Sequence, residues 1–202
     1  MNIVFDFGNV LVRWEPELMF TSFFGKDEAA YWYFWRHVCT LDWRNRIDAG
    51  EDIPACVAEL QQSYPDYAEA IAMYDTRWEE ALTGEVPGMR SLVQSLLDHG
   101  QHPVYGLTNW SMATFPKARL RFPILQLIEN YIVSGDVHLV KPDPRIFQLL
   151  LDRFGLRADE TLFIDDNEDN VIAATRLGFH GIHFTGANSL RNLLTNNYYI
   201  AI

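Results

Sequence analysis

Short apolar runs that favour β-strands alternate with helical stretches along the second half of this 202-residue chain. An apolar run at the start of the chain also favours a strand, which would stop at Asp6. Strands separated by helices predict a mostly parallel, right-handed sheet covered by helices on both faces. The later strand-like runs are Pro103–Leu107, Tyr131–Val133, Thr161–Ile164 and Gly181–Phe184.

Helices are predicted between these strands from apolar spacing and from their end signals. Asp143 and Pro144 form a typical helix start, because Asp caps the first turn and Pro fits its first position. The helices expected from these signals are Met89–Leu97, Asp143 to about Gly155, Asp169–Leu177 and Ser189–Leu194.

The segment from about Trp14 to Val86 has a different character from the rest of the chain. It is dense in aromatic residues, lacks strand alternation and is expected to be helical. Glu85–Gly88 is the expected return point to the main domain. The sequence therefore predicts one α/β domain with a helical insertion.

Composition excludes several kinds of protein. The formal charge of −11 argues against a nucleic-acid partner, which needs clustered Lys and Arg. We expect no membrane association and a cytoplasmic location, because no apolar segment approaches the ~18 residues of a membrane span and no basic region precedes the first apolar run. Cys39 and Cys56 lack metal-ligand spacing and are expected to be buried as small apolar residues. The sequence does not determine the oligomeric state.

Polar groups stand directly after three of the predicted strands. Asp6 follows the first strand, Thr108 and Asn109 follow Pro103–Leu107, and Asp165-Asp166 follow the run that contains Ile164. In open α/β folds the crevice beyond the carboxyl ends of parallel strands binds ligands. Each group taken alone is more often a turn former or a helix cap, but together they predict a site.

Lys141, between Val140 and Pro142, completes a set suited to phosphoryl transfer. A carboxylate such as Asp6 can attack phosphorus, and an ammonium can steady the phosphoryl oxygens. Adjacent carboxylates at Asp165 and Asp166 would repel each other without a cation between them, and Mg²⁺ prefers such hard oxygen ligands. The set predicts metal-assisted phosphoryl transfer through an aspartyl-phosphate.

The four motifs together resemble those of the haloacid dehalogenase superfamily of hydrolases. They are Asp6-Phe7-Gly8-Asn9-Val10, Leu107-Thr108-Asn109, Lys141-Pro142 and Phe163-Ile164-Asp165-Asp166-Asn167. The wording of the first, third and fourth motifs is most similar to the bacterial alpha-D-glucose-1-phosphate phosphatase-like subgroup. The resemblance implies a Rossmann-like core domain, residues 1–13 and 87–202, with a small helical cap domain, residues 14–86, inserted after the first strand.

The resemblance also implies a role for each motif residue. Asp6 is the expected nucleophile, and Thr108, Asn109 and Lys141 are the expected substrate-binding residues. The expected cofactor is Mg²⁺. Its expected ligands are Asp6, Asp166, the carbonyl of Gly8 and Asp165 in a supporting role. The implied activity is hydrolysis of a small phosphorylated metabolite, such as the sugar phosphate glucose 1-phosphate.

Gly8 departs from the superfamily pattern. Most phosphatases of the superfamily carry there a second aspartate that acts as general acid and base, which typically contributes about 10²- to 10⁴-fold. Its absence predicts a slower enzyme, a good leaving group such as the anomeric oxygen of a sugar 1-phosphate, or a substitute from the cap. His37, Asp42 and Asp48 are the candidate substitutes.

Two other functions remain open. A haloacid dehalogenase would also use a nucleophilic carboxylate, although the Asp165-Asp166 pair would disfavour an anionic haloacid. A non-catalytic phosphate-binding module is the other alternative. The fingerprints of serine hydrolases, P-loop NTPases and dinucleotide-binding enzymes are all missing.

Overall fold

The computed structural model describes all residues from Met1 to Ile202 and contains a five-stranded parallel sheet. This confirms the predicted α/β class. The central strand is β1, and the strand order reverses there because β4 lies on one side and β6 on the other. Such a reversal opens a crevice at the carboxyl ends of the strands. In spatial order the strands are β5 (Tyr131–Val133), β4 (Val104–Thr108), β1 (Asn2–Phe5), β6 (Thr161–Asp165) and β7 (His180–His183).

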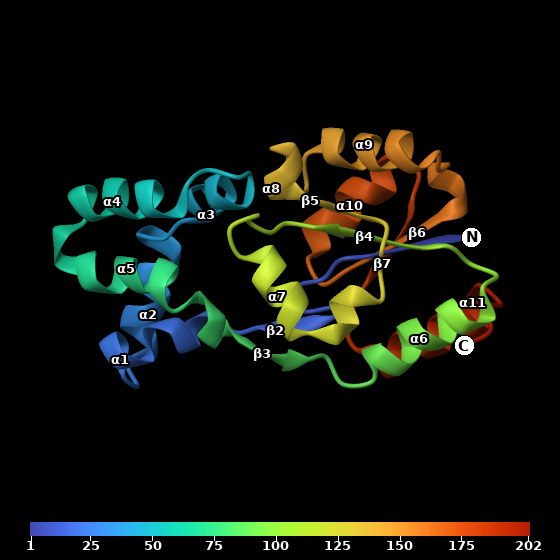
Figure 1. Ribbon diagram of the computed structural model, residues 1–202, viewed down its shortest axis with the longest axis horizontal. Coiled ribbons are helices and arrows are strands. Elements are labelled where there is room, and N and C mark those ends of the chain that lie inside the picture. The colour runs from blue at the N-terminus through green and yellow to red at the C-terminus, as the bar shows by residue number, and fades with distance from the viewer.

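Helices cover both faces of the sheet, as Figure 1 shows with α9 above and α6 and α11 below. Side chains alternate along each strand, so Val4 packs with one apolar cluster while Ile3 and Phe5 pack with the other. On the Val4 face lie α9 (Pro144–Phe154) and α10 (Glu168–Arg176); on the other face lie α6 (Met89–His99), α7 (Phe115–Arg121) and α11 (Ala187–Asn197). The shorter helical pieces are α8 (Ser134–Val137), η4 (Pro123–Gln126) and η5 (Ala158–Glu160).

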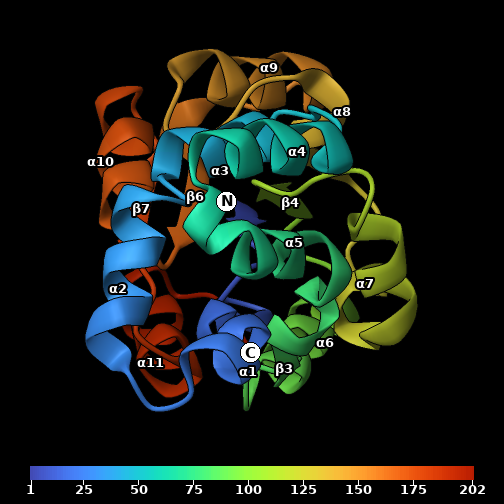
Figure 2. The same ribbon diagram turned by 90° about the vertical axis from the view of Figure 1, so that its left-hand side faces the viewer.

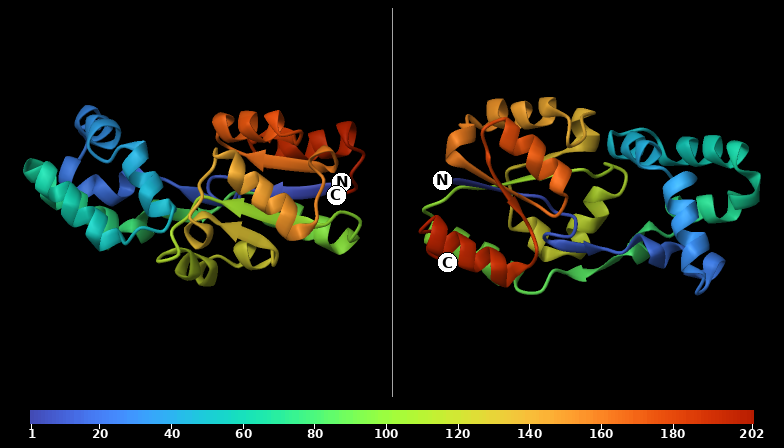
Figure 3. Two further views of the ribbon diagram at one scale, coloured as in Figure 1. Left: turned by 90° about the horizontal axis from the view of Figure 1, so that it is seen from above. Right: turned by 180° about the vertical axis from the view of Figure 1, so that it is seen from behind.

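Residues 16–81, hereafter the helical insert, form a group of helices beyond one end of the sheet (Figures 1 and 2). Figure 3 shows the insert at the end of the sheet opposite the N-terminus, which is the side toward which β1 runs. Asp27, Thr40 and Asp52 accept hydrogen bonds from backbone N–H groups at three helix starts. The elements are η1 (Pro16–Phe20), α1 (Thr21–Phe24), α2 (Glu28–His37), α3 (Leu41–Asp48), α4 (Ile53–Ser63), η2 (Pro65–Tyr67), α5 (Ala68–Thr76) and η3 (Trp78–Ala81).

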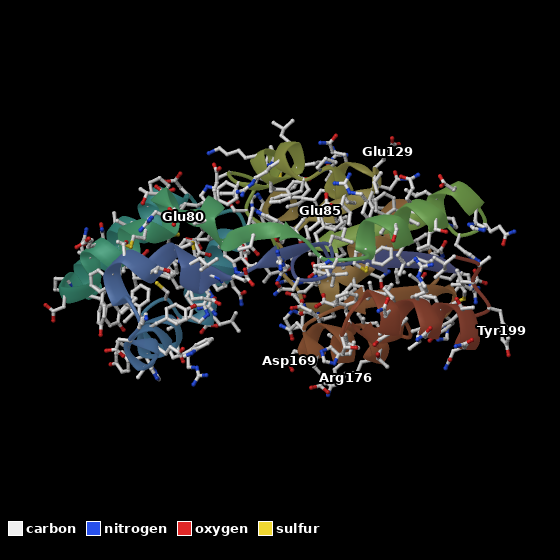
Figure 4. All side chains as sticks on the ribbon, turned by 90° about the horizontal axis from the view of Figure 1, so that it is seen from below. Glu80, Glu85, Glu129, Asp169, Arg176 and Tyr199 are labelled. Carbon is white, nitrogen blue, oxygen red and sulfur yellow. The ribbon has the colours of Figure 1, made fainter.

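A two-stranded antiparallel ribbon connects the insert to the sheet-bearing part. It consists of β2 (Val12–Trp14) and β3 (Leu82–Glu85). In Figure 4, Glu80 lies over the insert and Glu85 lies toward the sheet, so β3 runs from one part to the other. The expectation that the whole segment from Trp14 to Val86 is helical was therefore wrong at both ends, because strands this short carry too few residues to show an alternating pattern.

The remaining elements lie close to their predicted positions. Asp143 caps α9 by accepting from the Arg145 N–H, as expected. Asn167, rather than either preceding aspartate, caps α10. Cys39 and Cys56 are buried and unpaired, which confirms their expected apolar role. None of the helices combines the length and apolar character needed to cross a membrane.

Candidate active site

Three carboxylates meet where β1 and β6 end side by side. The two strands pair in register from Asn2 to Phe5, and the Asp6 N–H extends the ladder by donating to the Ile164 carbonyl at 2.8 Å. Asp6, Asp165 and Asp166 each offer a carboxylate oxygen within 4.8 Å of the others. Oxygen donors at this spacing can converge on one divalent cation with small side-chain adjustments.

Lys141 is the cation that this structure places among the carboxylates. Its Nζ lies 2.8 Å from Asp6 Oδ1 and 2.7 Å from Asp165 Oδ2, and it also donates to the Leu107 carbonyl at 2.9 Å. The three donors of the ammonium thus all have protein partners. Lys141 is only 3% exposed, so contact with a substrate phosphate would require it to exchange one of these partners.

The pKa values of Asp6 and Asp166 are both raised above the ordinary value of an aspartate. Burial raises the pKa of Asp6 to about 7; the Lys141 ammonium opposes this rise, while Asp165 and Asp166 add to it. Burial also raises the pKa of Asp166, against a hydrogen bond from Asn9. Burial disfavours the charged form of Lys141, but the two carboxylates outweigh it and raise the pKa of Lys141. A bound divalent cation would favour the ionised carboxylates.

Three asparagines orient the two carboxylates at the end of β6. Asn170 Nδ2 donates to both oxygens of Asp165 at 3.1 Å, and the Asn167 N–H donates to Asp165 Oδ1 at 2.8 Å. Asn9 Nδ2 donates to Asp166 Oδ2 at 3.1 Å. Asp165 is fully buried with both oxygens engaged, whereas Asp166 lines the pocket described below. Asp166 is therefore the more accessible carboxylate of the pair.

Thr108 and Asn109 differ in how they are used. Thr108 Oγ1 is buried and has no hydrogen-bond partner in the protein. Asn109 instead holds the Lys141 backbone from both sides: its Nδ2 donates to the Lys141 carbonyl at 2.9 Å and its Oδ1 accepts from the Lys141 N–H at 2.8 Å. The Asn109 side chain thus positions Lys141, and only its backbone remains for the substrate contact predicted from the sequence.

Gly8 leaves open space beside Asp6. A Cβ added at Gly8 would meet only Asp6 Oδ2, at 3.9 Å. Because Oδ1 is engaged by Lys141, Oδ2 is the Asp6 oxygen that faces this space. The Gly8 carbonyl accepts from the Val10 N–H at 2.6 Å and keeps a second lone pair for a cation.

A cavity of about 210 Å³ lies over these groups, between the sheet edge and the helical insert. Among the residues that the sequence singled out, Asp6, Gly8, Asp48, Asn109 and Asp166 line it, whereas most of the wall residues were not predicted. Aromatic density marked the insert in the sequence, yet gave no indication of which rings face inward. The walls are Trp14, Leu41, Arg44, Ile47, Asp48, Ile53, Tyr74 and Trp78 from the ribbon and insert, and Asn9, Trp110, Ser111 and Thr114 from the core.

The C-terminal end of α3 is bonded to the core beside the cavity. Ser134 Oγ donates to the Asp48 carbonyl at 2.5 Å, and His138 Nδ1 lies 2.7 Å from the Ala49 carbonyl. Gly50 has a φ of +99°, and a Cβ there would lie 2.7 Å from the Gly135 carbonyl. Only glycine permits this approach of the two backbones. We refer to this contact between residues 48–50 and residues 134–138 as the latch.

Comparison with known proteins places this geometry in context. Sesquiterpene phosphatase astK of Aspergillus oryzae is 33% identical over 183 residues, which cover 90% of this chain and 88% of that protein. Drimenol cyclase drtB of Aspergillus calidoustus is 31% identical over 98 residues, 48% of this chain, but the match spans only 19% of that protein.

A solved structure shares the fold across almost the whole chain. A haloacid dehalogenase family enzyme from Bacteroides thetaiotaomicron superposes with a TM-score of 0.73 at 20% identity, covering 96% of this chain and 97% of that one. The same enzyme has been solved with magnesium and inorganic phosphate, with a TM-score of 0.63, 20% identity and coverage of 88% and 90%. The model of the haloacid dehalogenase-like hydrolases matches residues 1–178. The chain therefore belongs to the haloacid dehalogenase-like hydrolase family, as its motifs predicted.

Proposed function

We propose that this chain is a magnesium-dependent phosphatase that hydrolyses a small phosphorylated metabolite through an aspartyl-phosphate on Asp6. The observation that carries the proposal is the position of Asp6, which stands among Lys141, Asp165 and Asp166 while its Oδ2 faces open space. A carboxylate held in this way is oriented to attack phosphorus.

Each motif residue has a role that its contacts support. Asp6 and Asp166, with the Gly8 carbonyl, would hold Mg²⁺, and Asp165 would support them while keeping Lys141 in place. The bound cation would neutralise charge on the phosphoryl oxygens. Thr108 Oγ1, buried without a partner, would donate to one of those oxygens. Lys141 would offset the negative charge that builds up around Asp6.

The substrate belongs to a class of small molecules, because the cavity is about 210 Å³ and most ligand pockets are larger, roughly 300 to 1,000 Å³. A cavity of this size favours a compact ester such as the sugar phosphate glucose 1-phosphate. Trp14, Trp78 and Trp110 line the cavity with aromatic side chains, and Ser111 and Thr114 line it with polar ones. The leaving oxygen of a sugar 1-phosphate also needs less help from an acid, which suits the glycine at position 8.

A phosphate ester of an apolar alcohol is a second candidate substrate. Leu41, Ile47 and Ile53 line the insert side of the cavity in addition to its aromatic rings, and apolar walls favour an apolar leaving group. The similarity to a sesquiterpene phosphatase supports the same class.

We propose that residues 14–86, which comprise the helical insert together with Trp14 and β3, form a cap unit, and that residues 1–13 and 87–202 form the other unit. The insert supplies most of the cavity walls beyond the carboxylates. Haloacid dehalogenation is the less favoured reaction, because three carboxylates beside one another repel a substrate carboxylate unless a cation offsets their charge. Phosphate esters are repelled in the same way, but their reaction uses the bound cation that offsets this charge.

The test is phosphate release from a substrate panel with and without Mg²⁺, comparing the wild type with Asp6→Asn. The panel contains glucose 1-phosphate, glucose 6-phosphate, farnesyl phosphate and 2-chloropropionate, the last assayed for chloride. We expect Mg²⁺-dependent phosphate release that Asp6→Asn lowers on the order of 10⁴- to 10⁶-fold, as for other covalent nucleophiles. Asp42→Asn, an exposed carboxylate outside the cavity, is the matched control.

The panel separates the alternatives. Chloride release in the presence of EDTA would replace phosphatase by dehalogenase. Tight Mg²⁺-dependent binding of a phosphate ester without release would indicate a binding module. A preference for farnesyl phosphate over both sugar phosphates would select the apolar substrate class.

A further inference from the structure

The absence of an aspartate at position 8 leaves the proposed reaction without a proton donor for the leaving group, and the structure separates the three candidate substitutes. His37 and Asp42 are exposed and do not reach the cavity. Asp48 lines the cavity together with Asp6 and Gly8. Asp48 is thus the one candidate that shares a cavity with the nucleophile.

The latch fixes Asp48 relative to the phosphate side of the site. Ser134 Oγ donates to the Asp48 carbonyl and accepts from the Trp110 N–H at 2.8 Å. Trp110 follows Asn109, which in turn holds the Lys141 backbone. One buried hydroxyl therefore connects Asp48 to the loop that positions Lys141.

The carboxyl group of Asp48 makes no hydrogen bond or ion pair within the protein. Only burial and charges at a distance perturb it, and no protein group donates a hydrogen bond to it. Asp48 is half-buried and lines the cavity, so its unpartnered carboxyl group is accessible to a ligand there. The charged and titratable groups around it are Arg44 on α3, Tyr74 on α5, Lys141, Asp6 and Asp166 from the core, and His138 at the latch.

Arg44 does not neutralise this carboxyl group by direct contact. Its Nη1 donates to the backbone carbonyls of Trp35, at 2.9 Å, and Cys39, and its guanidinium lies over the Trp35 ring at 4.0 Å. Burial raises the pKa of Asp48 to about 7, with Arg44 and Lys141 opposing the rise. A carboxyl group with a pKa near the working pH is suited to general acid and base catalysis.

We propose, building on the phosphatase function above, that Asp48 is the general acid and base of this enzyme and replaces the aspartate missing at position 8. In the first step Asp6 Oδ2 attacks phosphorus, the bond from phosphorus to the leaving oxygen breaks, and that oxygen takes the proton of the Asp48 carboxyl group. In the second step water attacks the aspartyl-phosphate and gives its proton to Asp48. The bond from phosphorus to Asp6 then breaks and releases phosphate.

The test compares Asp48→Asn with the wild type on two kinds of ester at saturating Mg²⁺. An alkyl phosphate has a leaving oxygen that needs a proton, whereas p-nitrophenyl phosphate has one that departs without it. We expect Asp48→Asn to lower kcat about 10²- to 10⁴-fold on the alkyl phosphate and far less on p-nitrophenyl phosphate. Asp42→Asn, on the same helix, should change neither. A general acid also predicts that wild-type kcat on the alkyl phosphate falls above about pH 7 and that this limb disappears in Asp48→Asn.

A second variant provides a gain of function. The open space at Gly8 admits an aspartate, and Gly8→Asp in the Asp48→Asn background should restore much of the lost alkyl phosphatase activity. Equal losses on both esters, or an unchanged pH profile, would overturn the role of Asp48 while leaving the phosphatase in place. Absence of any Asp6-dependent release from wild-type protein would overturn both.

Discussion

The two sides of the cavity differ in how firmly their polar groups are held by other protein groups. On the core side, Lys141, Asp165, Asn109 and Asn170 are tied to one another by hydrogen bonds and ion pairs, and Lys141 and Asp165 are almost completely buried. On the insert side, apolar residues dominate and the carboxyl group of Asp48 has no partner. Groups fixed before the substrate arrives stabilise a transition state without reorganisation. In the proposed reaction the core would therefore hold the phosphoryl group in a fixed geometry, and the insert would contact the leaving group.

The largest effect should come from removing the buried cation of the core side. Lys141→Met leaves Asp6 and Asp165 without their shared partner, and breaking a buried ion pair costs about 3–5 kcal/mol of unfolding free energy. Urea unfolding at pH 7.5 in EDTA measures it, with the exposed Lys26→Met as control.

The stability loss of Lys141→Met should also depend on pH. Lower pH should shrink the loss, because Asp6, whose pKa is raised to about 7, then gains a proton and loses the charge that Lys141 balances. A Lys141→Met protein as stable as Lys26→Met would show that the core side is not held together by this network.

An intermediate effect is expected at the latch, where the two sides meet. Ser134→Ala removes the donor to the Asp48 carbonyl and leaves the buried Trp110 N–H without an acceptor. An unsatisfied buried group costs about 1–3 kcal/mol. Thermal unfolding should show this loss, and kcat on an alkyl phosphate should fall more than kcat on p-nitrophenyl phosphate. Ser63→Ala, on the exposed surface of α4, should change neither the melting temperature nor kcat. An equal fall of kcat on both esters would show that the latch does not act through Asp48.

The smallest effect concerns the insert side alone. The folded-state pKa of Asp48, about 7, lies above its ordinary value of 3.8, so between these values the folded protein binds more protons than the unfolded chain. The contribution of Asp48 to the free energy of unfolding therefore falls as pH rises from about 4 to 7. Asp48→Asn removes this contribution. The difference in unfolding free energy, variant minus wild type, should therefore be more favourable to the variant at pH 8 than at pH 5, by at most about 2 kcal/mol. Melting temperatures in EDTA measure it; parallel pH curves for the two proteins would contradict the raised pKa.

The sequence predicted the core side better than the insert side. Asp6, Thr108 and Asp165 could be brought together on paper because the carboxyl ends of parallel strands share one edge. The hydrogen bonds that saturate Lys141 were not predictable, since they depend on side-chain orientation in a loop. Asn109 stays a predicted substrate-binding residue through its backbone N–H, and the bonds of its side chain to the Lys141 backbone could not be predicted.

The sequence predicted where the insert lies along the chain, but not which of its residues face the cavity. Its helices follow local signals such as the caps at Asp27, Thr40 and Asp52. Which face of α3 turns toward the cavity depends on contacts with residues more than 80 positions away, as the bond from Ser134 to Asp48 shows. For that reason His37, Asp42 and Asp48 could not be ranked from the sequence.

The latch has a consequence for how such an enzyme changes over evolutionary time. On the insert side it uses the carbonyls of Asp48 and Ala49 and the bare backbone of Gly50, and these carbonyls are present whatever side chains α3 carries. The latch itself therefore does not depend on the side chains of Leu41, Ile47 and Ile53. A lineage built on this chain could explore new alcohols by replacing wall residues alone, while the phosphate chemistry beneath them is inherited unchanged.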